Sequence, residues 1–195
     1  MGKMLDPKNV TVRADRMMKE HLALFEEYFG SYEREGSRYC FDFNGSTSVT
    51  VYYENDSKLL TKTFSTAVRI TIRNIAMRKS WKARLNMSGK LKLEKLFLKA
   101  LDQDSKDMAD EFNGNTELLG KMLSLFRDFD LEAMTVEYRK DAQELDVTIR
   151  PYPGAFIWVK IPPVYYDIRL KPEEVRKIYQ ITELFSNFYS NEKLM

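Results

Sequence analysis

The sequence is poor in the side chains that most often carry chemistry. Among 195 residues there is one histidine, His21, and one cysteine, Cys40. One chain therefore cannot form a histidine–cysteine metal site or an internal disulfide. A Ser-His-Asp triad would need His21, but G-x-S-x-G is absent and His21 lies beside the apolar face of a predicted helix, which favours a packed histidine. Cys40 lies in a predicted strand and is expected to be a small buried thiol.

Glycine-rich phosphate loops are also absent. The eight glycines are scattered, and neither G-x-G-x-x-G nor G-x-x-x-x-G-K-[ST] occurs. Five acids cluster in one segment: Asp102, Asp104, Asp107, Asp110 and Glu111. They lack the glycine of a calcium loop, which favours a solvated acidic connection. We therefore expect no cofactor and no metal. The sequence leans away from an enzyme, with a carboxylate-only hydrolase left open.

Long apolar runs are missing as well. No run approaches the roughly 20 residues of a membrane helix, and residues 1–10 lack the apolar core of a signal peptide. Hydrophobic residues make up 44% of the chain and charged residues 31%, which is typical of a soluble globular protein. These features predict a cytoplasmic protein without a membrane span.

Apolar periodicity predicts an α+β protein. Residues 7–29 have helical spacing between Asp6-Pro7 and Gly30, and a second helix is predicted to begin after Lys171. Between them lie alternating segments typical of strands, and Asn44-Gly45 indicates a hairpin. The predicted strands read RYCFDF, STSVTVYYEN, TFSTAVRITIRNI, SWKARLNM, AMTVEYR, ELDVTIRPY, AFIWVKI and VYYDIRL. KLKLEKLFLKALDQ is interpreted as a helix, although its first five residues fit a strand equally.

The predicted order is helix, four strands, helix, and it occurs twice, over 1–104 and 110–195. Asn115 is expected to cap the short helix that opens the second half, and 104–115 is read as a connection. We expect antiparallel sheets covered by helices, in one globular unit or two tightly packed lobes. A degenerate duplication is one reading of the matching order, and a chance run of elements is the other.

Charge is segregated along the chain, although the net charge is only +2. Residues 62–99 hold eleven basic residues against one acid, a net charge of +10, and residues 102–117 hold six acids against one lysine, a net charge of −5. If the strands around Arg69 and Lys82 pair through residues 74–80, four cations share one sheet face: Arg69, Arg73, Lys82 and Arg84. This face is our candidate site for an anionic partner, which could be a phosphorylated metabolite, nucleic acid or a membrane surface. The alternative is a solvated face balanced by the acidic segment.

Two further hypotheses remain open. One is a small-molecule pocket, with or without catalysis, between sheet and helices, lined by tyrosines such as Tyr52, Tyr53, Tyr138, Tyr165 and Tyr166. The other is self-association through a sheet edge. Trp81 lies in the apolar register, so the exposed aromatics of many nucleic-acid sites are not evident.

IPPVYYDIRL, residues 161–170, bears on the pocket hypothesis. Its two prolines cannot donate to a ladder, which indicates a bend or break between two strands. The alternation then places Val164, Tyr166, Ile168 and Leu170 inward. Tyr165 and Arg169 lie on the other face and are our candidates for residues that line a cleft.

Residues from Lys106 onward, KDMADEFNGNTELLGKMLSLF and later FIWVKIPP, resemble uncharacterised prokaryotic α+β domains of unknown function. The residues that carry this resemblance are Asp110, Phe112, Gly114, Asn115, Leu118 and Leu119. It covers less than half of the chain. It implies no activity and no catalytic residue, and it favours a prokaryotic protein without a known reaction. From the residues themselves, the expected partner is an anionic ligand or another protein.

Overall fold

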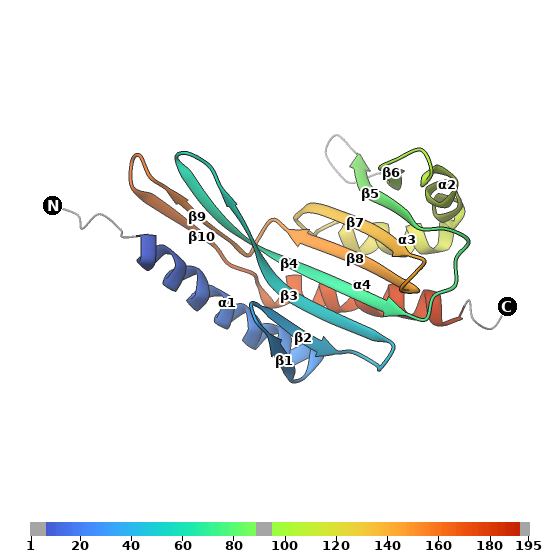
Figure 1. Ribbon diagram of the computed structural model, residues 1–195, viewed down its shortest axis with the longest axis horizontal. Coiled ribbons are helices and arrows are strands. Elements are labelled where there is room, and N and C mark those ends of the chain that lie inside the picture. The colour runs from blue at the N-terminus through green and yellow to red at the C-terminus, as the bar shows by residue number, and fades with distance from the viewer. Residues whose placement is uncertain (1–6, 89–94, 192–195) are drawn as a thin grey trace.

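The computed structural model describes residues 7–88 and 95–191, and within them the predicted α+β class is confirmed (Figure 1). Ten strands, all paired antiparallel, form one sheet. The helices are α1 (Pro7–Phe29), α2 (Lys106–Gly114), α3 (Thr116–Phe126) and α4 (Pro172–Asn191). The strands are β1 (Tyr32–Glu35), β2 (Arg38–Asp42), β3 (Thr47–Ser57), β4 (Thr61–Arg73), β5 (Trp81–Ser88), β6 (Lys95–Ala100), β7 (Leu131–Arg139), β8 (Glu144–Pro151), β9 (Ala155–Val159) and β10 (Val164–Ile168).

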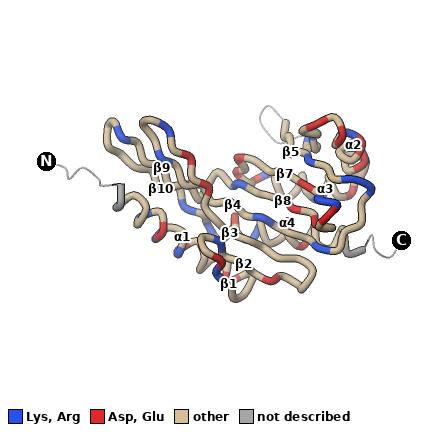
Figure 2. Tube along the Cα trace, viewed as in Figure 1, with Lys and Arg blue, Asp and Glu red and all other residues tan. Residues whose placement is uncertain are grey.

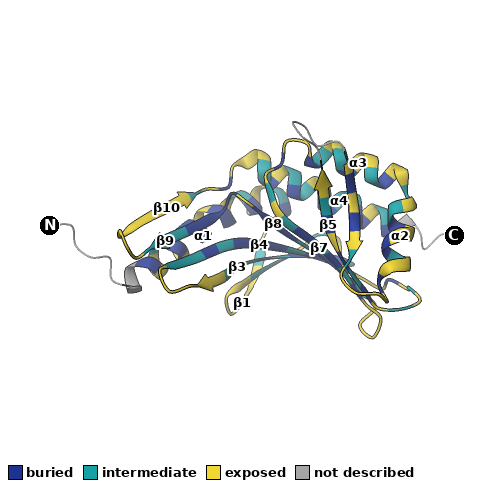
Figure 3. Cartoon of the chain, turned by 90° about the horizontal axis from the view of Figure 1, so that it is seen from above, coloured by how far each residue is buried: buried dark blue, intermediate teal, exposed yellow. Residues whose placement is uncertain are grey.

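Strand β4 organises the sheet. One of its edges pairs with β3 over the full length of both strands, and the other edge pairs with two strands in succession. Residues 61–65 pair with β9, and residues 68–73 pair with β8. The sheet therefore forks: a main part has the order β1-β2-β3-β4-β8-β7-β5-β6, and an arm consists of β9, β10 and the adjoining ends of β3 and β4 (Figures 1 and 3).

Helices cover one face of the sheet and leave the other open (Figure 3). Along β4, Val68, Ile70 and Ile72 are buried in the main core, while Arg69 and Arg73 project from the opposite face. The helix predicted to begin after Lys171 is confirmed as α4, and its inner stripe is buried against the sheet: Val175, Ile178, Thr182, Phe185 and Tyr189. Helix α1 continues beyond this core and covers the arm, where Val10, Ala14 and Met17 pack on Phe64 and Phe156.

Three predictions about local structure are wrong. Residues 95–100 form strand β6 rather than a helix, because Leu96 and Leu98 alternate with Lys95 and Phe97 and pair with β5; residues 90–94 lie outside the described part. Residues 106–114 form α2 rather than a connection, since Ala109 and Phe112 reach the core. Strand β1 was not expected. The first half therefore has six strands, and the matching element order is not found.

The edge strand β6 is held by a side chain of α2. Asn113 accepts a hydrogen bond from the backbone N–H of Leu98 at 2.7 Å and donates one to its carbonyl at 2.8 Å. An amide side chain thus replaces the missing neighbouring strand at one position of an edge that would otherwise present free backbone groups.

A hydrogen-bonded chain through His21 joins α1 to the point where the sheet forks. The backbone N–H of Leu170 donates to His21 Nε2 at 3.2 Å, so Nδ1 carries the proton and faces Thr66 Oγ1 at 3.4 Å. Thr66 Oγ1 in turn donates to the carbonyl of Gly154 at 2.8 Å. His21 is 1% exposed, which confirms the packed histidine, and it is here a neutral bridge between three segments.

The register predicted for β10 is wrong at Val164 and Tyr166, which are exposed, although Leu170 just beyond the strand is buried as predicted. Tyr165 stacks on Phe156 beneath α1, and Arg13 of α1 lies over its ring at 4.4 Å. Tyr166 pairs with Ile157 on the opposite, open face and is exposed. At Tyr165 and Tyr166 the covered and open faces are the reverse of those predicted. The reason is that α1, which is distant in the sequence, covers the face that the apolar alternation predicted to be outer. The predicted break at Pro162-Pro163 is confirmed as the turn between β9 and β10.

Acid should destabilise the protein through His21. Burial lowers the pKa of His21 from 6.5 to about 4. Between pH 6.5 and pH 4, His21 is therefore protonated in the unfolded chain but neutral in the folded chain. The free energy of unfolding falls as the pH falls below about 6.5. Urea unfolding from pH 7.5 to pH 4 should show that His21 contributes about 3 kcal/mol to this loss. The difference in unfolding free energy between wild type and His21→Gln isolates this contribution, and a pH-independent difference would contradict it.

Gly154→Ala should destabilise the fork of the sheet. Gly154 has a φ of +90°, and an added Cβ would lie 2.8 Å from Thr66 Oγ1. Left-handed backbone and overpacking against a buried threonine should together cost about 3 kcal/mol. Gly45→Ala is the matched control, because Gly45 has a φ of +73° and open space around its Cβ. Equal losses of unfolding free energy in the two variants would disprove close packing at Gly154.

Candidate anion-binding site on the open sheet face

The four predicted anion-binding residues lie on the open face, but in two separate groups. Strand pairing places Arg69 and Arg73 on β4, and Lys82 and Arg84 on β5. The expected pairing of these strands through residues 74–80 is wrong, because β8 and β7 lie between them. Two long-range strands contributed by the second half of the chain therefore separate the cations.

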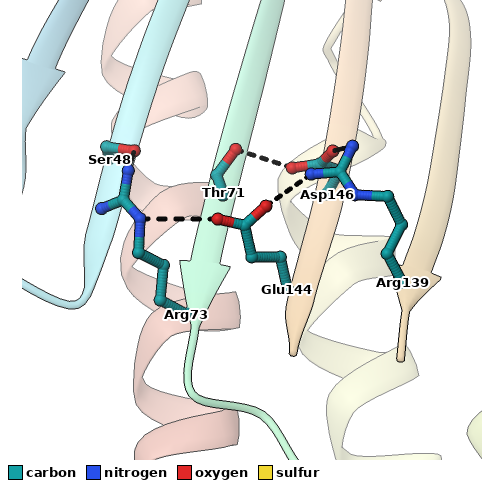
Figure 4. A network of polar contacts seen from close by, with 6 residues as sticks. All are labelled: Ser48, Thr71, Arg73, Arg139, Glu144 and Asp146. Carbon is teal, nitrogen blue, oxygen red and sulfur yellow. Dashed lines mark hydrogen bonds and ion pairs between the residues drawn. The ribbon is translucent and has the colours of Figure 1, made fainter. Parts of the chain in front are cut away.

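Acids of β8 fill the space beside β4 (Figure 4). Glu144 accepts from Arg139 at 2.5 Å and lies 3.6 Å from Arg73 Nε. Asp146 pairs with Arg139 at 2.9 Å and accepts from Thr71 at 2.6 Å. The hydrogen bond to Glu144 raises the pKa of Arg139 above its ordinary value. Arg73 also donates to Ser48 at 3.1 Å, so Arg73 belongs to a network that already balances its charge.

Lys82 is paired in the same way. Its Nζ lies 2.8 Å from Glu137, and farther along the face Arg150 lies 2.7 Å from Glu54. Charges of both signs thus alternate across the open face (Figure 2). To the cations of residues 62–99 the acidic segment contributes one ion pair among the described residues, Lys79 with Asp107 at 3.4 Å. The balance comes from cross-strand neighbours instead.

A hollow of about 630 Å³ lies at the other end of this face, over β1, β2, β3 and β4. Tyr52, Thr50 and Ser48 of β3 line its floor together with Arg69 of β4, because register places them on one face. Arg38 and Cys40 of β2 lie beside them, and Glu33, Glu35 and Asp42 are at the rim with Arg73 and Glu144. The hollow is thus a polar depression in the sheet face.

Two guanidinium groups flank one aromatic ring in this hollow. Arg69 lies 5.8 Å and Arg38 5.7 Å from the ring centre of Tyr52. Among the described residues neither has an ion pair, and Arg69 Nε is buried without a hydrogen-bond partner. A buried donor left without a partner costs free energy. Arg69 is therefore the one cation of the predicted four that combines a place in the hollow with an unmatched charge.

Sequence reasoning missed Arg38 and Cys40, and it assigned Tyr52 to a pocket between sheet and helices rather than to this hollow. Cys40 is partly exposed beside Thr50, with its sulfur 3.7 Å from Thr50 Oγ1. The expectation of a buried thiol is wrong because the buried residue of β2 is its neighbour Phe41. The alternation within RYCFDF could have predicted this arrangement. If Phe41 faces the core, Arg38 and Cys40 both lie on the sheet face opposite to Phe41.

Arg84 lies outside this hollow, near the β6 edge. It is directly opposite Lys99 across β5 and β6, and beside Thr135 of β7. No acid pairs with it among the described residues. Phe97 on the same face of β6 is 39% exposed, so one aromatic does accompany these cations, contrary to the inward position predicted for it.

The tyrosines considered for a pocket do not converge. Tyr138 is buried in the main core, where it donates to the carbonyl of Ile75. Tyr53 packs beside the core under α1, and burial raises the pKa of its phenol above the ordinary value. Tyr165 and Tyr166 lie on opposite faces of β10. Arg169 pairs with Glu20 at 2.8 Å and Asp167 at 3.1 Å. A cleft at Tyr165 and Arg169 stays a prediction.

In the described part of the chain, the His, Cys, Asp and Glu side chains form no group of three that could hold a metal ion. None of its helices is long and apolar enough to cross a membrane.

Comparison with known proteins identifies a family. Residues 23–189 match the family described as "Protein of unknown function (DUF3156)". Curated proteins and solved structures gave no match. The matched segment spans nearly all of the fold from the middle of α1 to α4. The expectation of an uncharacterised domain of unknown function is therefore confirmed, and the chain belongs to the DUF3156 family.

Proposed function

We propose that this protein is a binding protein whose hollow over β1–β4 takes a small anionic ligand with a carboxylate or phosphate group. The observation that carries the proposal is the guanidinium of Arg69, which lies in the hollow with its Nε buried and unpartnered among the described residues. Planar guanidinium groups bind these anions through paired hydrogen bonds. Arg38 supplies a second cation on the other side of Tyr52.

The surroundings of Arg69 favour a compact polar ligand. The volume of about 630 Å³ falls within the range of small-molecule sites. Thr50 and Ser48 offer hydroxyl groups on the floor, and Tyr52 offers a ring face against which a planar group can stack. The rim carboxylates of Glu33, Glu35 and Asp42 disfavour a long polyanion, because its further phosphates would meet like charge. Nucleic acid is thus a poorer fit to this hollow than a small anion.

The other predicted cations serve the site indirectly. Arg73 is tied to Glu144 and Ser48, so it shapes one wall. Lys82 and Arg84 lie beyond β8 and β7, outside the hollow. The cytoplasmic location and prokaryotic origin expected from the sequence stay predictions.

Calorimetric titration with pyrophosphate and with citrate, at matched ionic strength against sodium chloride, tests this function. Wild type should bind at least one of them with a single site. Arg69→Gln should weaken binding by about 10- to 100-fold, because a hydrogen bond to a charged group contributes about 1.5–3 kcal/mol. Arg38→Gln should weaken it in the same direction.

Arg84→Gln is the matched control. Arg84 is exposed on the same sheet face and lacks an ion pair among the described residues, but it lies outside the hollow. Its loss should leave the affinity unchanged. If Arg84→Gln weakens binding as much as Arg69→Gln, the attraction is diffuse and the hollow is not the site. Absence of binding to both anions would also overturn the proposal.

A further inference from the structure

The arm carries an unusual concentration of exposed apolar side chains. Leu59 is 90% exposed and Ile161 is 68% exposed. Four further large apolar side chains of the arm are exposed: Leu60, Val164, Tyr165 and Tyr166. Scattered exposed apolar residues are ordinary, but a contiguous group marks an interaction site.

Leu59, Leu60 and Ile161 form a contiguous group because two hairpin turns lie side by side. The turn between β3 and β4 holds Leu59 and Leu60, and the turn between β9 and β10 holds Ile161. The backbone N–H of Lys160 donates to the carbonyl of Leu60 at 2.7 Å, which ties one turn to the other. Both turns project at the end of the arm, away from α2, α3 and β5–β6 (Figures 1 and 3). We call the group Leu59, Leu60, Ile161, Pro162 and Pro163 the tip.

An apolar strip leads from the tip along the open face of the arm. Pairing places Val159 beside Val164, and Ile157 beside Tyr166 in the next row. Ile157 and Val159 are partly buried, and their β10 neighbours are exposed. Aromatic side chains thus lie just behind the tip: Trp158 and Tyr165 on the face toward α1, and Tyr166 on the open face. Amphipathic rings of this kind favour the boundary between lipid and water.

Charge at the tip is mainly positive. Lys58, Lys62 and Lys160 lie in or beside the two turns, and neither residues 57–66 nor residues 155–166 include an acid. Lysines mark both turns in Figure 2. Lys58 pairs with Asp56 of β3 at 3.3 Å, and that pair is the one acidic contact recorded for these three lysines among the described residues. Lysine stems extend over apolar surface while their ammonium groups reach outward, so this layout suits an apolar layer covered by anionic groups.

We propose that the tip docks on an anionic lipid bilayer. Leu59, Leu60 and Ile161 enter the acyl region, and Lys58, Lys62 and Lys160 meet lipid phosphates. Such binding is peripheral, reversible and stronger on anionic than on neutral lipid. It is independent of ligand binding in the hollow, which lies at the other end of β4.

A bilayer explains the tip better than a protein partner does. The charged groups are mainly positive and lie beside a projecting apolar end, whereas a protein interface of useful size requires a broad complementary surface. The edge strand β10 offers a competing explanation, because its free edge could pair with β10 of a second copy. Self-association is therefore the outcome that the test must distinguish.

Vesicle co-sedimentation tests the proposal. The full chain should sediment with vesicles of equal phosphatidylcholine and phosphatidylglycerol, and weakly with phosphatidylcholine alone. Leu59→Ser with Ile161→Ser should reduce partition by about tenfold or more. The triple change of Lys58, Lys62 and Lys160 to Gln should reduce it by about fivefold for each lysine, and added salt should act alike.

Matched controls lie at the opposite end of the sheet. Leu101→Ser removes a leucine that is 51% exposed, and Lys95→Gln with Lys99→Gln removes two exposed lysines of β6; neither should change partition. Brominated acyl chains should quench wild-type fluorescence, and Trp158→Phe should abolish the quenching, because Trp81 lies in β5, far from the tip. Thermal unfolding confirms that each variant is folded.

Three outcomes would overturn the docking proposal. Wild type could fail to sediment with anionic vesicles, or the β6 lysine control could lose as much partition as the tip variants. Alternatively, light scattering could show a dimer in wild type and a monomer in the Leu59→Ser, Ile161→Ser variant. The last result would assign the arm to contact between two copies of the chain.

Discussion

Strand β4 has to pair with three strands, and the rest of the molecule is arranged around that requirement. Its partner changes from β9 to β8 between Ser65 and Val68, which leaves the backbone around Thr66 without a regular ladder on that edge. A free backbone group in a buried place is costly, and the carbonyl of Gly154 accepts the Thr66 N–H at 3.0 Å. Histidine 21 then ties α1 to the same point. The fork divides a covered main sheet, with its balanced charges, from an arm whose support is α1.

The two candidate surfaces differ in how their charges are satisfied. Cross-strand acids neutralise the middle of the open face, where Glu144 and Asp146 lie between the cations of β4 and β7. Arg69 lies toward β3, on the side away from those acids, and its neighbour there is Thr50. Its charge is consequently unmatched within the described chain. At the tip Asp56 pairs with Lys58, but residues 57–66 and 155–166 contain no acid, so the positive charge there is only partly balanced. The excess of positive charge at the tip can be read from the local sequence. The unpaired charge of Arg69 becomes evident only from the order of the strands in the sheet.

Sequence patterns were sufficient where an element's environment follows from its own periodicity. The inner stripe of α4, the hairpin at Asn44-Gly45 and the cap at Asn115 depend on neighbours a few residues away, and all are present. Predictions were wrong where the environment of an element is set by segments that are distant in the sequence. The short amphipathic segment 95–100 fits helix and strand alike until β5 is known to be beside it, and α1 reverses the inner side of β10. The candidate site was missed for the same reason, since Arg38 and Arg69 meet through β3.

The order of strands also governs what a growing chain can do. Strand β4 is complete by residue 73, but its second edge is filled by residues 144–159. During synthesis from the N-terminus, one edge of β4 and the cations Arg69 and Arg73 therefore remain without their final neighbours while about seventy further residues are added. A ribosome-bound first half holds a positively charged, half-paired sheet, which a chaperone or the ribosome surface can shield until β8 and β9 arrive. Cutting the chain between its halves cannot give two stable domains, because the strand that each piece needs belongs to the other.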